Sequence, residues 1–462
     1  MNSLAYNATV LRLTRARALL LASILIWWVA LFPGRLGYDY ALLARIIREG
    51  EQTSWWGASY FWLFKITTLN AQFLGFISLL SILALAHAIS HFVRSLISDN
   101  KLADKILLFV YLTPFFGVFG LTVSHDVFQS SGIILLTSIL IRNHTGSINK
   151  STLRISLPLC GIYLTTTQYG IVIFVLATLF LSRKYFSFFV ASVAIGVLVS
   201  FISNLTIVQE SELTLQKQFF IRDLILIDLK CITQHDGAEI TTEEWVFLET
   251  FAKKEAWKEK VSCSNPDVLA APLKLRDTEA PLDFALIENA ARIFSRQPAI
   301  PVMSHIQRSR VALPPPFFQP PDNQVELDVK KPIGLGTNTA LQNGPGLLHP
   351  SIDDGILRQR PTFLRPLEGI ALLPAFIVNQ ASWFWSWGGL WFYPLMIFTL
   401  GITKRKKFAA LGILAPSVLL HLVIVLVGPS SLGRYVMSTI LMGFICMVIQ
   451  IRKYLIGRMV TI

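Results

Sequence analysis

The chain has 462 residues, of which 53% are hydrophobic and only 15% are charged, and its formal net charge is +13. This composition, with a mean hydropathy of +0.55, excludes an ordinary soluble protein and predicts a membrane protein. The positive charge does not indicate nucleic-acid binding, because the basic residues form short clusters between apolar runs. Such clusters instead report the orientation of membrane segments.

The N-terminus begins like a signal peptide, with Arg12, Arg15 and Arg17 before the first apolar run. No small-residue cleavage site follows. The run continues through Trp27-Trp28 and is broken by Pro33-Gly34 instead, so we expect an uncleaved membrane span.

Apolar runs predict most of the membrane spans directly. They lie at 17–33, 70–93, 105–122, 127–142, 186–207, 385–403, 408–427 and 433–451. Residues 155–182 contain two short runs that meet at the polar patch Thr165-Thr166-Thr167-Gln168, so we expect a hairpin of two short helices with this patch at the outer surface. The hairpin keeps every Lys/Arg cluster between spans on the side of the N-terminus. The predicted fold is an all-α, multi-pass protein of the cytoplasmic (inner) membrane, with about ten membrane segments and both termini cytoplasmic.

This topology predicts three domains. An N-terminal membrane domain covers 1–207 and includes a first external loop, 34–69, in which the amphipathic stretch from Trp55 to Lys65 lies along the membrane surface. A mainly helical extracytoplasmic domain, 208–384, is inserted before the last three spans. The C-terminal spans and a cytoplasmic tail form 385–462.

The exported domain has recognisable local signals. Thr241-Thr242-Glu243-Glu244 predicts a helix start with a capping box, followed by Trp245, Leu248 and Ala252 on one face. Residues 282–297 predict a second amphipathic helix, stopped by Gln297-Pro298. The Pro- and Gly-rich stretch 314–366 predicts a mobile loop.

Four cysteines are present. Cys160 and Cys446 fall in membrane segments, where we expect apolar packing. Cys231 and Cys263 fall in the exported domain, where an oxidising compartment permits a disulfide. His235 is the nearby alternative ligand for a metal, but no CxxC or HxxxH spacing accompanies the two cysteines.

Polar residues at the outer ends of separate spans are the candidates for chemistry. Asp39, His125, Asp126 and Arg434 emerge on the same predicted face. Each alone is explained as a helix cap or a solvated side chain. Together they fit transfer of a group from a phosphate donor, because a carboxylate can deprotonate a hydroxyl, and Arg and His can hold the charge on a departing phosphate.

The layout resembles the GT-C superfamily of integral-membrane glycosyltransferases, which use polyprenyl-phosphate-linked sugars. Tyr38-Asp39-Tyr40 matches the position of the family's essential Asp, just after the first span. Ser124-His125-Asp126-Val127-Phe128 matches its second acidic motif, and Arg434-Tyr435 enters a late span as in the family. Two departures are the lone Asp of the first loop and His125, which stands where Lys or Arg is common. The likeness extends to an uncharacterised bacterial subgroup and covers most of 15–205 and 385–450 as architecture.

The resemblance implies a role for each residue. Asp39 would be the general base that deprotonates an extracytoplasmic acceptor, with Tyr38 and Tyr40 beside it. Asp126 would orient the acceptor or bind a divalent cation, the one cofactor considered. His125, Arg434 and Tyr435 would hold the lipid phosphate. In the exported domain, His305 and Arg308 would either assist or form a plain solvated helix face.

Two other functions remain open from the sequence. One is a carrier or flippase that moves lipid-linked sugars without chemistry, although internal repeats typical of transporters are missing. The other is a non-catalytic membrane scaffold whose exported domain binds a partner. Clustering of Asp39, Asp126 and Arg434 around one outward cavity would favour the enzyme.

Overall fold

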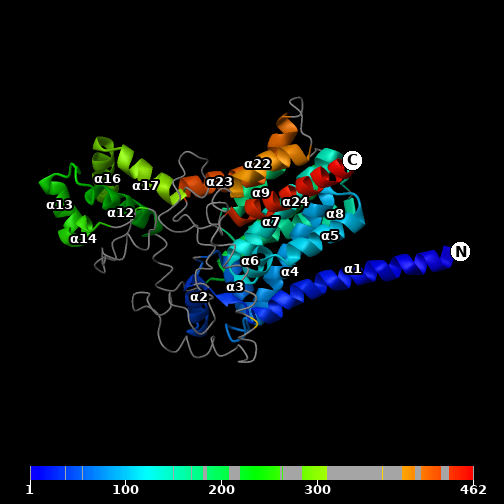
Figure 1. The fold of residues 1–462 in the computed structure, drawn as a ribbon. Coiled ribbons are helices and arrows are strands. Elements are labelled where there is room, and N and C mark those ends of the chain that lie inside the picture. Colours follow the sequence, from blue (N-terminus) through cyan, green and yellow to red (C-terminus); the bar gives the residue numbers. More distant parts are fainter. Residues whose placement is uncertain are drawn as a thin grey trace. The chain divides into compact units, whose positions relative to one another are not determined.

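The computed structural model describes residues 2–36, 38–54, 56–148, 150–167, 169–180, 185–207, 219–260, 263, 284–309, 367, 388–400, 407–427 and 436–460. The chain divides into two compact units. The first contains Met1–Gln209, Glu326–Leu420 and Arg434–Ile462, and the second contains Glu210–Val325 and His421–Gly433. Helices dominate the described residues, which is consistent with the predicted all-α class (Figure 1). The stretch 314–366 lies outside them.

The start of the first loop, just after the first helix, packs tightly against a neighbouring helix. Helix α1 (Asn2–Ala30) leads through Pro33-Gly34 into the two-residue strand β1 (Arg35–Leu36). Gly34 has φ +122°, and a Cβ added there would lie 2.5 Å from Ser78 Cβ. Ser78 Oγ donates a hydrogen bond to the carbonyl of Pro33 at 2.6 Å. Glycine is therefore required for the chain to pass this close to α4 (Gly75–Leu96).

Two helices follow β1 in the first loop. These are α2 (Tyr38–Arg48) and α3 (Ala58–Thr67), the latter within the stretch predicted to be amphipathic. Residues Ala58, Tyr60, Phe61 and Phe64 of α3 are buried. The loop therefore packs against the rest of the first unit through an apolar face.

The span predicted at 105–122 is wrong as a single helix. It consists of α5 (Asn100–Tyr111) and α6 (Pro114–Gly120), which lead to the strand β2 (Thr122–Val123). The break has a local cause, because proline lacks an N–H and pushes the preceding residue out of the helical region. Thr113 is accordingly extended, with φ −75° and ψ 145°. The indole N–H of Trp27 donates to the carbonyl of Tyr111 at 2.8 Å, satisfying one acceptor at the break.

Helix α7 (His125–Thr145) is the central helix of the first unit. It is buried from Asp126 to Ile141 and packs against α4 and α8 (Lys150–Leu164), as Figure 1 shows. Gly132 lets α8 approach closely, and the Cys160 thiol donates to the Gly132 carbonyl at 3.2 Å. The buried Cys160 and Cys446 are free, as predicted for both.

The C-terminal helices belong to the same unit. They are α22 (Gly388–Thr399), α23 (Lys407–Val427), whose last residues from His421 fall in the second unit, and α24 (Met437–Val460). Helix α24 packs against α22 and also contacts α7 and α5.

Two short helices occupy the region predicted to be a hairpin. They are α8 and α9 (Gly170–Thr178), and a Cβ at Gly161 would lie 3.3 Å from the Phe174 ring, as in antiparallel packing. Thr165, Thr166 and Thr167 of the turn are buried in the protein, and their predicted position on the outer side of the membrane stays a prediction. The first loop covers them: Gly57, with φ +94°, would place a Cβ 2.7 Å from the Thr166 carbonyl oxygen. The hairpin turn therefore lies at the same end of the unit as the first loop.

Several features indicate a membrane protein. Among the described residues, Gly75–Leu96 and Met437–Leu455 are helical, long and apolar enough to cross a bilayer. Shorter apolar helical segments are Ala16–Ala30, Leu153–Leu164, Val190–Leu205 and Leu411–Val425. Large apolar side chains are also exposed, such as Ile26 of α1 at 61% and Phe201 of α10 (Phe186–Leu205) at 58%. Exposed apolar faces of this kind suit contact with lipid. The number of crossings and their orientation stay predictions.

The second unit is a helical domain with its own core. Its helices are α12 (Phe219–Thr233), α13 (Thr242–Glu249), α14 (Lys254–Lys258), α16 (Phe284–Arg296) and α17 (Ala299–Ser309). The predicted capping box is confirmed: Thr241 Oγ1 accepts from the Glu244 N–H, and the Glu244 carboxylate accepts from the Thr241 N–H. Leu248 and Ala252 lie in the core and Trp245 packs against it. The helix predicted at 282–297 is also present as α16.

A buried lysine joins two parts of this core. Lys230 of α12 is fully buried, and its ammonium group donates to the carbonyls of Ala256, Trp257 and Glu259 at the end of α14. Burial lowers the pKa of Lys230 to about 8, opposed by the charge of Glu259. Since an ammonium group has three protons, each has an acceptor, which is the condition for burying such a charge.

Cys231 and Cys263 form a disulfide in the second unit, with 5.8 Å between their Cα atoms and a separation of 32 positions in the sequence. A loop of that length gives about 3–4 kcal/mol of stabilisation in the chain-entropy model. Mass spectrometry of unreduced protein should therefore find the linked peptides. Replacing both cysteines by serine should speed hydrogen exchange in α12 and leave α4 unchanged. Free thiols at both positions, in protein from an oxidising compartment, would contradict the pairing.

Candidate active site

A short strand pairing lays the two acidic motifs of the sequence side by side. Strands β1 and β2 are parallel, with Leu36 paired to Val123, and each leads into a helix. Asp39 is the second residue of α2 and Asp126 the second residue of α7, and each follows its paired strand residue by three positions. The backbone thus places two equivalent strand–helix junctions side by side. At each junction a helix begins, so each carries the positive end of a helix dipole. The side chains of Tyr38 and Asp39 lie outside the described residues.

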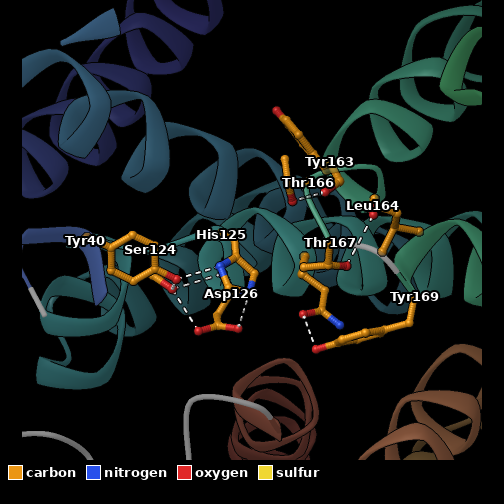
Figure 2. A network of polar contacts seen from close by, with 10 residues as sticks. Tyr40, Ser124, His125, Asp126, Tyr163, Leu164, Thr166, Thr167 and Tyr169 are labelled. Carbon is orange, nitrogen blue, oxygen red and sulfur yellow. Dashed lines mark hydrogen bonds and ion pairs between the residues drawn. The ribbon is translucent and has the colours of Figure 1, made fainter. Parts of the chain in front are cut away.

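Four side chains form a hydrogen-bonded network at this junction (Figure 2). The Tyr40 hydroxyl lies 2.9 Å from Ser124 Oγ and 2.6 Å from His125 Nδ1. Ser124 Oγ donates to Asp126 Oδ2 at 2.8 Å and accepts from the Asp126 N–H at 3.0 Å, so it also caps α7. His125 Nε2 lies 3.4 Å from Asp126 Oδ1. The first loop and the start of α7 therefore meet through polar contacts.

These contacts determine where the protons lie when Asp126 is ionised. A carboxylate only accepts, so Ser124 gives it its single hydroxyl proton. The contact between Tyr40 and Ser124 must then use the Tyr40 proton. His125 must in turn donate from Nδ1 to the Tyr40 oxygen. The imidazole is therefore either the Nδ1–H tautomer, with Nε2 as a base, or the doubly protonated cation beside Asp126.

Aromatic rings enclose the His125 imidazole. The Tyr40 and Tyr60 rings lie 5.9 Å and 5.8 Å from it, centroid to centroid, and Tyr60 also contacts Phe128 at 6.2 Å. Trp56 lies 6.2 Å from Tyr40. Burial, and secondarily the charge of Asp126, raises the pKa of Tyr60 well above its usual value, so this phenol keeps its proton.

A second polar group continues along α7 from Asp126. Gln129, one turn later and thus on the same face, is 3% exposed, and its Oε1 accepts from the Tyr169 hydroxyl at 3.2 Å. Tyr60, Gln129 and Tyr169 were not among the residues predicted from the sequence. The i, i+3 spacing of Asp126 and Gln129 was an available signal, but both aromatic partners are brought in by tertiary packing.

The other predicted site residues have different outcomes. The structure brings Tyr40, His125 and Asp126 together, whereas Arg434 and Tyr435 lie outside the described residues. His305 is in the second unit, where its imidazole contacts the backbone oxygen of Val425. Arg308 belongs to α17, but its side chain is not described.

The described side chains include no group of three His, Cys, Asp or Glu residues arranged to hold a metal ion. The divalent cation expected beside Asp126 stays a prediction. Among the described side chains of the site, the carboxylate of Asp126 and the imidazole of His125 could ligate such an ion.

Comparison with known proteins gives little further information. No family model matches the chain, and no curated protein sequence matches it. Among solved structures, the chain is similar to ArnT from Cupriavidus metallidurans in the apo state, with 11% identity, a TM-score of 0.32, and coverage of 95% of this chain and 78% of that chain. A similarity at this TM-score carries no argument about the fold or function of this protein.

Ser124→Ala should destabilise the first unit, because it removes both the cap of α7 and a hydrogen bond to a buried carboxylate. We expect a loss of about 2 kcal/mol in the free energy of unfolding, measured by SDS titration of the purified full-length protein. Ser124→Thr should restore most of it, since threonine also caps and donates. Ser147→Ala, at an exposed serine beyond the other end of α7, is the matched control. A loss no larger than that of the control would show that the network contributes nothing.

Proposed function

We propose that this protein is a membrane glycosyltransferase of the GT-C type. It would move a sugar from a polyprenyl-phosphate donor to an extracytoplasmic acceptor, which is a glycan, a lipid or a protein. The observation that carries the proposal is the pairing of β1 with β2. The two motifs that resemble the family's acidic motifs are 87 positions apart, yet this pairing gives their backbones adjacent, equivalent positions.

The reaction proposed is a direct displacement at the anomeric carbon. Asp39 takes the proton from the acceptor hydroxyl as its oxygen forms the new bond to that carbon. The bond between the carbon and the phosphate oxygen breaks, and polyprenyl phosphate leaves with the bonding electrons. Because the leaving group is already a phosphate, it needs no general acid.

His125 and Asp126 have complementary roles in this proposal. Doubly protonated, His125 carries positive charge next to the position expected for the phosphate, and Tyr40 and Asp126 fix the orientation of its ring. Asp126 also orients the acceptor or binds a divalent cation. Arg434 and Tyr435 are proposed to hold the lipid phosphate, on the strength of the motif resemblance alone.

Asp39→Asn should abolish most of the turnover and leave the fold intact. Asparagine has the size and polarity of aspartate but no basic oxygen, and removing a general base typically costs about 10²–10⁴-fold in rate. The assay follows release of polyprenyl phosphate from a polyprenyl-phosphate-sugar donor. In Asp126→Asn, KM for donor or acceptor should rise more than kcat falls.

The matched control for these variants is Glu51→Gln, at an exposed acid of the same loop. Near-wild-type turnover of well-folded Asp39→Asn would refute the proposed mechanism. Transport of lipid-linked sugar without product formation, by the wild type and Asp39→Asn alike, would establish the carrier function instead.

The proposal also requires a definite topology. Reporter fusions after Lys105, Lys150, Lys184, Lys407 and Arg458 should all report a cytoplasmic location, because these positions follow the basic clusters. A fusion after Lys260 should report an exported one. A cytoplasmic location for Lys260 would place the second unit on the side away from the acceptor and contradict the proposal.

A further inference from the structure

Helices α4 and α7 carry a cluster of basic side chains that takes no part in the proposed reaction. His87, His91 and Arg94 are spaced i, i+4 and i+7, so they share one face of the helix. The His87 and His91 rings are 4.6 Å apart, centroid to centroid. Helix α7, which packs against α4, adds Arg142 in its last turn, as α4 carries Arg94 in its own last turn. The cluster therefore joins two neighbouring helices.

The cluster lies far from the Tyr40–Asp126 network. Arg142 follows His125 by 17 positions along the unbroken helix α7, which corresponds to about 25 Å at 1.5 Å per residue. It belongs to the last turn of α7, and Arg94 belongs to the last turn of α4. The two sites are therefore at opposite ends of the same helix.

Part of this arrangement has an ordinary explanation. Cations in the last turn of a helix are stabilised by the negative end of its dipole, which accounts for Arg94 and Arg142. Arg94 also pairs with Asp104 of α5, Nη2 to Oδ1, at 2.8 Å. Neither contact involves the two imidazoles, which lie one and two turns deeper along α4.

Four buried nitrogen atoms in the cluster have no hydrogen-bond partner among the described residues. They are His87 Nε2, His91 Nδ1, Arg94 Nε and Arg142 Nε. Buried polar atoms in proteins are nearly always paired, and four such atoms in one place indicate a ligand that accepts hydrogen bonds. The two guanidinium groups donate only, so the ligand must be an acceptor.

The charge of the cluster selects an anion over a metal ion. The cluster contains two guanidinium groups, and Asp104 neutralises Arg94, so a single positive charge is left over when the histidines are neutral. Two imidazoles at i, i+4 are a familiar pair of metal ligands. Here, however, two adjacent guanidinium groups would repel a cation, whereas a guanidinium matches the geometry of a phosphate group.

We propose that His87, His91, Arg94 and Arg142 bind a phosphate group, supplied either by the head group of an anionic phospholipid or by free phosphate. A phosphodiester carries one negative charge, which neutralises the excess charge of the cluster. The inference is independent of the glycosyltransferase proposal, because it uses none of the residues of that site.

The test uses purified full-length protein in detergent, with phosphatidylglycerol and inorganic phosphate as separate probes in native mass spectrometry. Removing a charged hydrogen bond should weaken binding at least about tenfold in Arg142→Gln, and His91→Gln should weaken it by a smaller factor. Lys105→Gln removes the same charge from an exposed position of α5 and should bind like the wild type. His91→Gln also serves if Arg142→Gln fails to fold.

The two probes distinguish the source of the phosphate. Phosphatidylglycerol binding that falls in both variants and not in the control supports a lipid head-group site. Binding of inorganic phosphate with the same pattern, and none of phosphatidylglycerol, supports a site for free phosphate. Binding that is absent, or equal in the variants and the control, overturns the inference.

Discussion

The arrangement of the candidate site depends on two residue pairs of parallel strand, Arg35 with Thr122 and Leu36 with Val123. Parallel strands require a crossover between them, and here the crossover contains five helices, from α2 to α6. So short a ladder is weak by itself. Two further interactions support it: the contact of Gly34 with Ser78 just before β1, and the hydrogen bonds of Tyr40 just after it. Together with the ladder, these three interactions fix the same strand register.

Helix α7 connects both polar sites of the first unit. Its middle is buried and apolar or small, with Ser130, Ser131 and Gly132 allowing neighbouring helices to approach, as is typical of helix packing in membranes. Its first turn carries His125 and Asp126, and its last turn carries Arg142. Polar groups buried in such surroundings are costly unless they are paired, and in the first turn Tyr40 and Ser124 supply the partners.

The sequence predicted helices correctly where the residues that define the helix are close neighbours in the chain. The capping box at Thr241 and the amphipathic pattern of 282–297 depend on neighbours within one or two turns, and both elements are present. Pro114 was an equally local signal that the span at 105–122 breaks, and the hydropathy pattern concealed it because both halves are apolar. No local signal predicted that the loop around Gly57 would cover the threonines of the hairpin turn.

By itself, the sequence determined the class of the protein, most of its helices, and the two acidic motifs expected to act together, because apolar length, caps and turn residues act within a few positions. Only the tertiary structure decided that Tyr40 hydrogen-bonds to Ser124 and His125, that the Tyr60 ring contacts the imidazole, and that the helix carrying Arg142 packs against the helix carrying His91. The residues of each pair lie from 51 to 85 positions apart in the sequence. Their geometry follows from strand register and helix packing, which no local pattern of residues encodes.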